Sequence, residues 1–101
     1  MLVRRWLASV VPDEDQIMRM FEMEGLEPFP EELEAHTSIP DHRHPFDEVR
    51  MVAKGELLLN IAGNQLLLRP GDRITIPSNT KHSKKVNGEK SCICICAKKT
   101  F

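Results

Sequence analysis

Two histidines and an acid fall at alternating positions in one short stretch, "HRHPFDE", residues 42–48. If this stretch is extended, His42, His44 and Glu48 project to the same side, because side chains alternate between the two faces of a strand. A further histidine, His82, comes later in the chain, just after a predicted turn. We therefore expect a site built from three imidazoles and one carboxylate.

Three imidazoles and one carboxylate make a ligand set suited to one divalent transition metal. Nitrogen and oxygen donors without thiolate favour iron, manganese, nickel, copper or zinc over calcium or magnesium. Such ions accept up to about six ligands, so four protein ligands leave positions open for water or for a bound small molecule. A small-molecule ligand or substrate is therefore the expected partner.

Arg50 lies two residues after Glu48, so on a regular strand it faces the same interior, where an unpaired charge is costly. Two roles are open for it. The guanidinium can pair with Glu48 as a structural ion pair, or it can clamp an anionic substrate beside the metal as a catalytic residue.

The spacing of these residues resembles the first motif of the cupins: Gly, five residues, His, one, His, three or four, Glu, six, Gly. His42, His44, Glu48 and Gly55 match it, while His36 stands at the first glycine. The second cupin motif runs Gly, five residues, Pro, one, Gly, two, His, three, Asn. The residues that match the second motif are Gly71, Pro77 and His82, with Asn79 in place of its second glycine and Val86 in place of its asparagine.

The resemblance implies a mainly β fold, a single-domain cupin β-barrel or jelly roll of six to eight strands, with the metal inside its mouth. By the same resemblance, His42, His44, Glu48 and His82 are the metal ligands. The sequence "DEVR" also resembles the acireductone dioxygenases, a cupin group with an arginine at this offset.

Two functions follow as alternatives. The first is a metal-dependent enzyme, of the oxygenase or isomerase type, acting on a small anionic organic molecule. The second is a non-catalytic cupin module that binds a metal or a metabolite as a sensor or carrier. The fold cannot separate them, because one scaffold hosts many functions.

The elements that must position these residues can be read along the chain. "PDEDQIMRMFEMEG" predicts a short N-terminal helix that ends at Gly25. From Pro28 onward, short apolar runs separated by turn residues predict strands, including a hairpin whose two-residue turn is Gly63-Asn64. We expect residues 1–101 to form one domain, with residues 1–27 as a strand and helix extension and residues 28–101 as the barrel.

The predicted last strand, "SCICICAKK", is apolar on both faces, so it needs an apolar layer on each side. The helix or a partner subunit can supply the second layer, and we expect a homodimer. The thiols of Cys92, Cys94 and Cys96 are predicted to be small core side chains, with a redox or second metal site as the alternative. Lys81, Lys84 and Lys85, which flank His82, are predicted to form a solvated rim. 

The chain has 101 residues and a formal net charge of -1, which provides no global field to attract nucleic acid or an anionic membrane. Residues 1–48 carry twelve acids against four bases, and residues 49–101 carry ten bases against three acids, which we interpret as opposed surfaces. A membrane-spanning helix needs about 20 consecutive apolar residues, and no stretch of the sequence has that many. Three cysteines two residues apart suit disulfide geometry poorly, which favours a reducing, cytoplasmic location.

Overall fold

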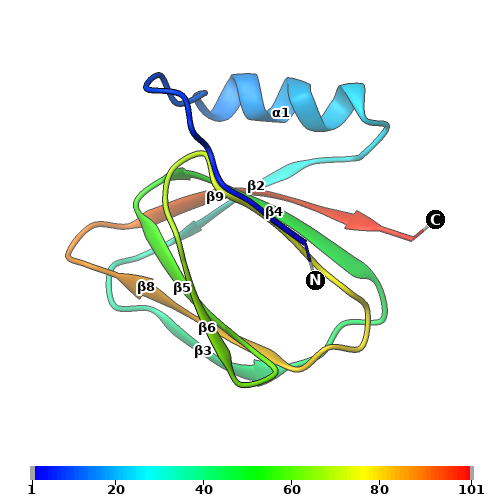
Figure 1. Ribbon diagram of the computed structural model, residues 1–101, viewed down its shortest axis with the longest axis vertical. Coiled ribbons are helices and arrows are strands. Elements are labelled where there is room, and N and C mark those ends of the chain that lie inside the picture. The colour runs from blue at the N-terminus through cyan, green and yellow to red at the C-terminus, as the bar shows by residue number, and fades with distance from the viewer. Residues whose placement is uncertain (1, 101) are drawn as a thin grey trace.

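The chain folds into two antiparallel β-sheets that enclose a common core, with one helix lying over the outer face of the larger sheet (Figure 1). The computed structural model describes residues 2–100. The larger sheet has the strand order β1-β7-β4-β9-β2, and the smaller sheet has the order β3-β8-β5-β6. The mainly β fold class predicted from the sequence is confirmed, with one short helix near the N-terminus.

The elements have the following bounds: β1 (Leu2–Arg4), α1 (Glu14–Met23), β2 (Phe29–Leu33), β3 (Ser38–His42), β4 (Asp47–Lys54), β5 (Glu56–Ile61), β6 (Asn64–Leu68), β7 (Arg73–Ile76), β8 (His82–Asn87) and β9 (Cys92–Lys99). These nine strands of the described residues exceed the expected six to eight. The N-terminal β1 adds to the edge of the larger sheet by pairing with β7.

The core between the two sheets is largely apolar. Its buried members are Val52, Leu57, Leu59, Ile61, Leu68, Ile74, Ile76, Val86, Cys92, Cys94 and Cys96. Alternation along each strand explains this set, since every second residue of β5, β8 and β9 points inward. The buried polar side chains Glu48, Arg50, His82 and Lys84 lie beside this core and belong to the candidate site or its surroundings.

The helix α1 supplies the second apolar layer that the two-sided strand β9 needs. Its start is fixed by a capping box, in which Asp13 and Gln16 each accept a hydrogen bond from the other's backbone N–H. Two side chains of this helix, Ile17 and Phe21, are fully buried. They pack with Ile95 on the outer face of β9. The cover for this face of the larger sheet therefore comes from the same chain.

Two local predictions are wrong. The hairpin between β5 and β6 turns at Ala62-Gly63, one residue earlier than expected, because these two residues have the positive φ angles (49° and 88°) that the turn requires. The stretch 42–48 is not one extended strand: β3 ends at His42 and β4 begins at Asp47. Pro45 in this connection has no N–H to continue a β-ladder.

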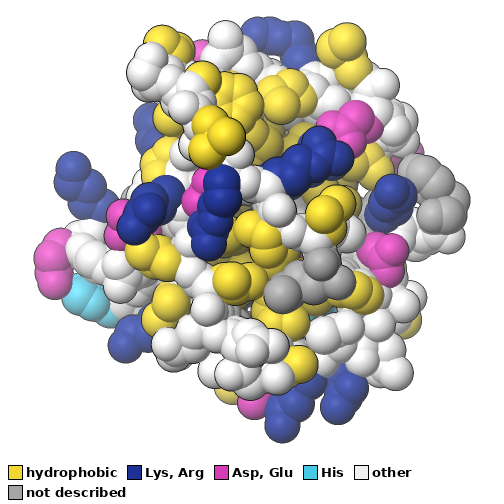
Figure 2. Space-filling model, viewed as in Figure 1, with side chains coloured by type: hydrophobic (Ala, Val, Ile, Leu, Met, Phe, Trp, Pro, Cys, Tyr) yellow, Lys and Arg dark blue, Asp and Glu magenta, His cyan; other side chains and the backbone are white. Residues whose placement is uncertain are grey.

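The opposite charges of the two halves of the chain are joined by ion pairs within the fold. Arg73 of β7 pairs with Glu24 after the helix at 2.6 Å, and Lys81 pairs with Asp41 at 3.7 Å. On the face shown in Figure 2, basic and acidic side chains are interspersed among apolar ones. Of the helices in the part of the chain that the structure describes, none is long and apolar enough to cross a membrane.

Candidate metal centre

Two of the three imidazoles come from neighbouring strands of the smaller sheet. His42 is the last residue of β3, His82 is the first of β8, and the two are directly paired across the antiparallel strands. Side chains of paired residues project to the same face of a sheet, and the burial of His82 shows that this is the inner face. The two ring centroids lie 4.3 Å apart.

The third imidazole, His44, comes from the connection between the two sheets. Its ring stacks on Phe46 at a centroid distance of 4.9 Å and an interplanar angle of 17°. Its carbonyl oxygen accepts a hydrogen bond from the backbone N–H of Asn79 at 2.6 Å. These contacts fix His44 although it lies outside a strand. One ring nitrogen from each of His42, His44 and His82 lies within 4.8 Å of the other two.

Backbone carbonyls set the orientation of two rings. Nδ1 of His42 lies 2.8 Å from the carbonyl oxygen of Pro40, and Nδ1 of His82 lies 2.8 Å from that of Thr80. A carbonyl can only accept, so each neutral ring carries its proton on Nδ1 and presents the lone pair of Nε2. Histidines that bind a metal commonly have this tautomer: one ring nitrogen donates a hydrogen bond to a carbonyl and the other binds the metal.

Nε2 of His82 is buried and, among the described residues, has no hydrogen-bond partner. Leaving a buried acceptor unsatisfied costs about 1–3 kcal/mol, so this atom needs an explanation. The pKa of His44 lies below its ordinary value because burial of the ring outweighs the attraction of Glu48. A lowered pKa keeps this ring neutral at pH 7, which is the form that binds metals. The three imidazoles therefore fit a divalent transition metal.

Glu48 reaches the same place from the larger sheet. It lies near the start of β4, with Oε1 3.4 Å from Nε2 of His44 and Oε2 3.2 Å from Nε of Arg50. Burial on its own raises the pKa of the Glu48 carboxyl, but the charges of Arg50 and Lys84 outweigh it, and the pKa lies below its ordinary value. The carboxylate is thus ionised at neutral pH beside the imidazoles, although it is not within the 4.8 Å grouping of the three rings.

The guanidinium of Arg50 is 2% exposed and binds two carboxylates. Its Nε donates to Glu48, and its Nη1 donates to Glu31 at 2.8 Å. In the structure, Arg50 therefore makes the ion pair that was one of its two predicted roles. Its role as a clamp on an anionic substrate stays a prediction.

Two charged residues lie beside the site where the sequence did not predict them. Lys84 was expected on a solvated rim, but it is buried (6% exposed), and its Nζ lies 3.4 Å from Oε1 of Glu31. The signal for Lys84 was present, since it follows His82 by two residues and so shares its face of β8. For Glu31 no such signal exists, because its position depends on the pairing of β2 with β9.

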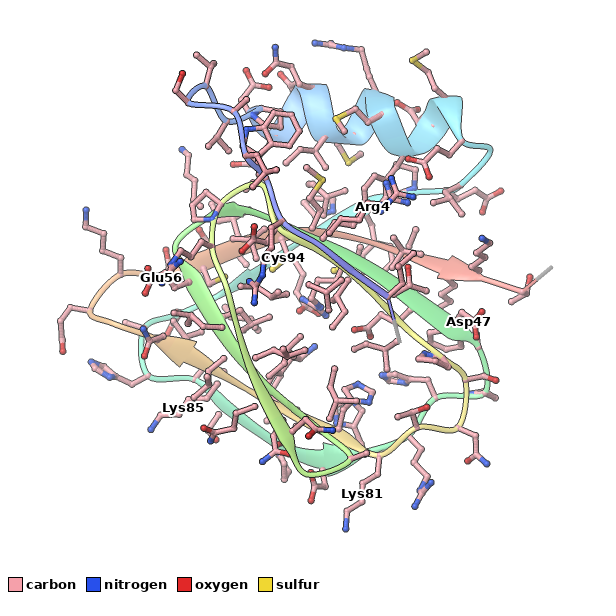
Figure 3. The ribbon with its side chains drawn as sticks, viewed as in Figure 1. Arg4, Asp47, Glu56, Lys81, Lys85 and Cys94 are labelled. Carbon is pink, nitrogen blue, oxygen red and sulfur yellow. The ribbon has the colours of Figure 1, made fainter. Side chains whose placement is uncertain are left out.

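The remaining candidates lie apart from the three rings. His36 is exposed, pairs with Glu89 at 3.0 Å and is not part of the group of ligand atoms. The three cysteine thiols are free and buried in the core, as predicted, and Figure 3 shows Cys94 lying between the layers. The contact of 3.8 Å between the sulfur atoms of Cys92 and Cys94 raises the pKa of Cys92 and lowers that of Cys94 to about 7.

Comparisons with known proteins agree with this geometry. A family model described as "Cupin domain" matches residues 30–98. Acireductone dioxygenase from Bacillus licheniformis is 32% identical in an alignment 60 residues long, which covers 54% of this chain and 34% of that protein. The chain therefore spans about a third of the length of this curated relative.

Solved structures share the arrangement of strands. A DMSP lyase from Ruegeria pomeroyi has a TM-score of 0.66 at 23% identity, over 73% of this chain and 38% of that one. Oxalate oxidase in complex with glycolate has a TM-score of 0.66 at 24% identity, over 76% and 43% of the two chains. The cupin domain of Schizosaccharomyces pombe Cnp3 has a TM-score of 0.70 at 12% identity, over 75% and 56%. At these identities the likeness concerns the fold alone.

Proposed function

The chain belongs to the cupin family, and from this premise we propose that it is a metal-dependent enzyme, of the oxygenase or isomerase type, acting on a small anionic organic molecule. The observation that carries the proposal is the unpartnered Nε2 of His82, which is buried beside two further imidazoles. This ring is held by a carbonyl at one nitrogen and has no partner at the other. Such a ring can donate the lone pair of its free nitrogen to a metal ion.

In this proposal His42, His44 and His82 hold the ion through their ring nitrogens, and Glu48 is the fourth ligand. The candidate ions are iron, manganese, nickel, copper and zinc. When bound, such an ion acts as a Lewis acid that polarises the oxygen atoms of a substrate. The relative from Bacillus licheniformis, an acireductone dioxygenase, supports an activity of the oxygenase type.

Arg50 then acts on the metal through Glu48. Its Nε donates to one carboxylate oxygen, which leaves the other oxygen directed toward His44. Fixing a ligating carboxylate by hydrogen bonds to its second oxygen is a common way to hold a metal ligand in position. A cavity of about 220 Å³ is lined in part by Phe46, whose ring stacks on His44, and by Asp47, but by none of the four proposed ligands; it is the proposed approach for a small molecule.

One observation favours the second function, a binding module without catalysis. Phe46 stacks flat on His44 and so covers one face of that imidazole, as expected of a protein that encloses an ion. An enzyme must have a water on its metal that a substrate can replace. Water exchange at the metal, measured by nuclear relaxation of solvent protons with the manganese form, separates the two functions.

The homodimer and the cytoplasmic location also stay predictions.

The metal site is tested by replacing one ligand at a time. Protein purified without a histidine tag is expected to hold about one transition metal ion per chain by elemental analysis. His42→Ala and His82→Ala are each expected to lose at least 10-fold in metal affinity, because each removes a direct ligand. The matched control is His36→Asn, since His36 is exposed and has a φ of 66° that asparagine tolerates. Equal metal content in His82→Ala and the wild type would contradict the proposal.

A further inference from the structure

Lys84 carries a buried positive charge beside the candidate metal centre. It lies on β8 two residues after His82, on the same inner face, and it is 6% exposed. Within residues 2–100, its ammonium group makes one polar contact, at 3.4 Å to Oε1 of Glu31. The same oxygen already accepts the shorter bond of 2.8 Å from Arg50. An ammonium group has three donors, so most of the binding capacity of Lys84 is unused.

The ion pairs beside the imidazoles join equal numbers of opposite charges. The two acids Glu31 and Glu48 face the two bases Arg50 and Lys84, and metal-binding imidazoles are neutral ligands. A divalent ion adds two positive charges at the partly buried imidazoles. Buried charge is strongly unfavourable unless it is compensated nearby. A ligand with two negative charges restores the balance.

We propose that Lys84 binds the second anionic group of a short dicarboxylate whose first carboxylate binds the metal. This inference rests on the proposed metal site and names the class of ligand that it accepts. Residues two apart on a strand are separated by about 6.6 Å, which suits an acid of a few carbon atoms lying along β8 from His82 to Lys84. Arg50 is less suited to this role, because both of its ion pairs are with buried or half-buried carboxylates of the protein itself.

The test measures binding, with the nickel-loaded protein as the sample and isothermal calorimetry as the method. The probes are malonate and succinate as dicarboxylates, with acetate as the monocarboxylate. We expect the wild type to bind at least one dicarboxylate 10-fold or more tighter than acetate. Lys84→Met is expected to lose this preference, because a charge-assisted hydrogen bond of ordinary strength accounts for about a 10-fold change. Its nickel content and its affinity for acetate are expected to change less than 3-fold.

Lys85→Met is the matched control, since Lys85 is the next residue of the same strand and points away from the sandwich in Figure 3. It is expected to bind the dicarboxylates as the wild type does. If Lys84→Met does not fold, Lys84→Gln removes the charge while keeping a donor for Glu31, and the same loss is expected. A wild-type preference that survives in nickel-loaded Lys84→Met or Lys84→Gln would overturn the inference alone, as would the absence of any preference in the nickel-loaded wild type. A wild type that binds no metal at its imidazoles would overturn the proposed function as well.

Discussion

At the scale of single residues, Arg50 is a charged side chain that is almost fully buried. Its side chain is among the largest that are fully buried, and it makes ion pairs with two carboxylates, those of Glu31 and Glu48. Arg50 is therefore needed for folding as well as for the geometry of Glu48.

Replacing Arg50 by methionine keeps much of its volume and removes its charge. Breaking a buried ion pair by removing one partner costs about 3–5 kcal/mol, because the remaining charge is left buried without compensation. We expect Arg50→Met to lower the free energy of unfolding by about this amount. Urea denaturation of the metal-free protein, followed by circular dichroism, measures the change.

Arg19→Met is the control for the loss of one arginine charge, because Arg19 lies exposed on the helix α1. An exposed substitution of this kind changes the free energy of unfolding by about 0.5 kcal/mol or less. If Arg50→Met and Arg19→Met are equally stable, Glu31 and Glu48 do not depend on Arg50 for charge compensation.

The sequence predicted that His42, His44 and His82 lie together, with His82 included through its place after a turn and its match to the second cupin motif. In the structure, His42 and His82 meet because β3 and β8 are paired at these two residues. The sequence could not predict Glu31, whose contact with Arg50 depends on strands that are far apart along the chain. Contacts of this kind are set by sheet pairing, which a local pattern does not contain.

At the scale of elements, the site is assembled from both sheets and from the connection between them. His42 is the last residue of β3 and His82 the first of β8 in the smaller sheet, His44 lies in the connection, and Glu48 is the second residue of β4 in the larger sheet. The spacing predicted one extended strand for the first-motif residues, whereas the structure brings His42 and His44 together from a strand end and a connection. Convergence arises because β3 and β4 approach the same end of the sandwich from different sheets.

The tight turn between β4 and β5 depends on Gly55. Its φ is 77°, and a Cβ atom there would collide with the backbone oxygen of Ser91 and lie 2.9 Å from Cα of Cys92. Gly63, in the turn between β5 and β6, has a similar φ of 88° but no heavy atom within 4 Å of such a Cβ. The two glycines therefore differ in their surroundings while sharing a left-handed backbone.

We expect Gly63→Ala to lower the free energy of unfolding by about 1–2 kcal/mol, the cost of placing an L-residue in the left-handed region. In Gly55→Ala the added Cβ atom also collides with the backbone of Ser91 and Cys92. The loss in the free energy of unfolding is therefore expected to be at least twice as large. Urea denaturation of both variants measures the difference. Equal losses would mean that the approach of β9 to the β4–β5 turn is looser than the structure shows.

At the scale of the whole molecule, a bound metal would join the two sheets beside their shared core. The apolar core between the sheets already holds them together through residues such as Leu57, Ile74 and Cys94. The site lies directly beside this core, since His82 is paired with the buried Ile61 and Glu48 with the buried Ile76. A metal held by the imidazoles of the smaller sheet and by Glu48 of the larger one would add a second link between the sheets. Metal binding should therefore stabilise the folded chain as a unit.

The expected size of this stabilisation follows from mass action. A ligand at 100 times its dissociation constant that binds only the folded state adds about 2.7 kcal/mol. In a domain of about 100 residues, each kcal/mol raises the midpoint of thermal unfolding by about 4–8 °C, so the nickel form should melt about 10 °C or more above protein in EDTA. Circular dichroism with and without nickel measures this shift. His82→Ala should lose the shift and His36→Asn should keep it, because only His82 belongs to the group of three rings. A shift of equal size in His82→Ala would mean that nickel binds elsewhere on the chain, and that the two sheets are not joined through these imidazoles.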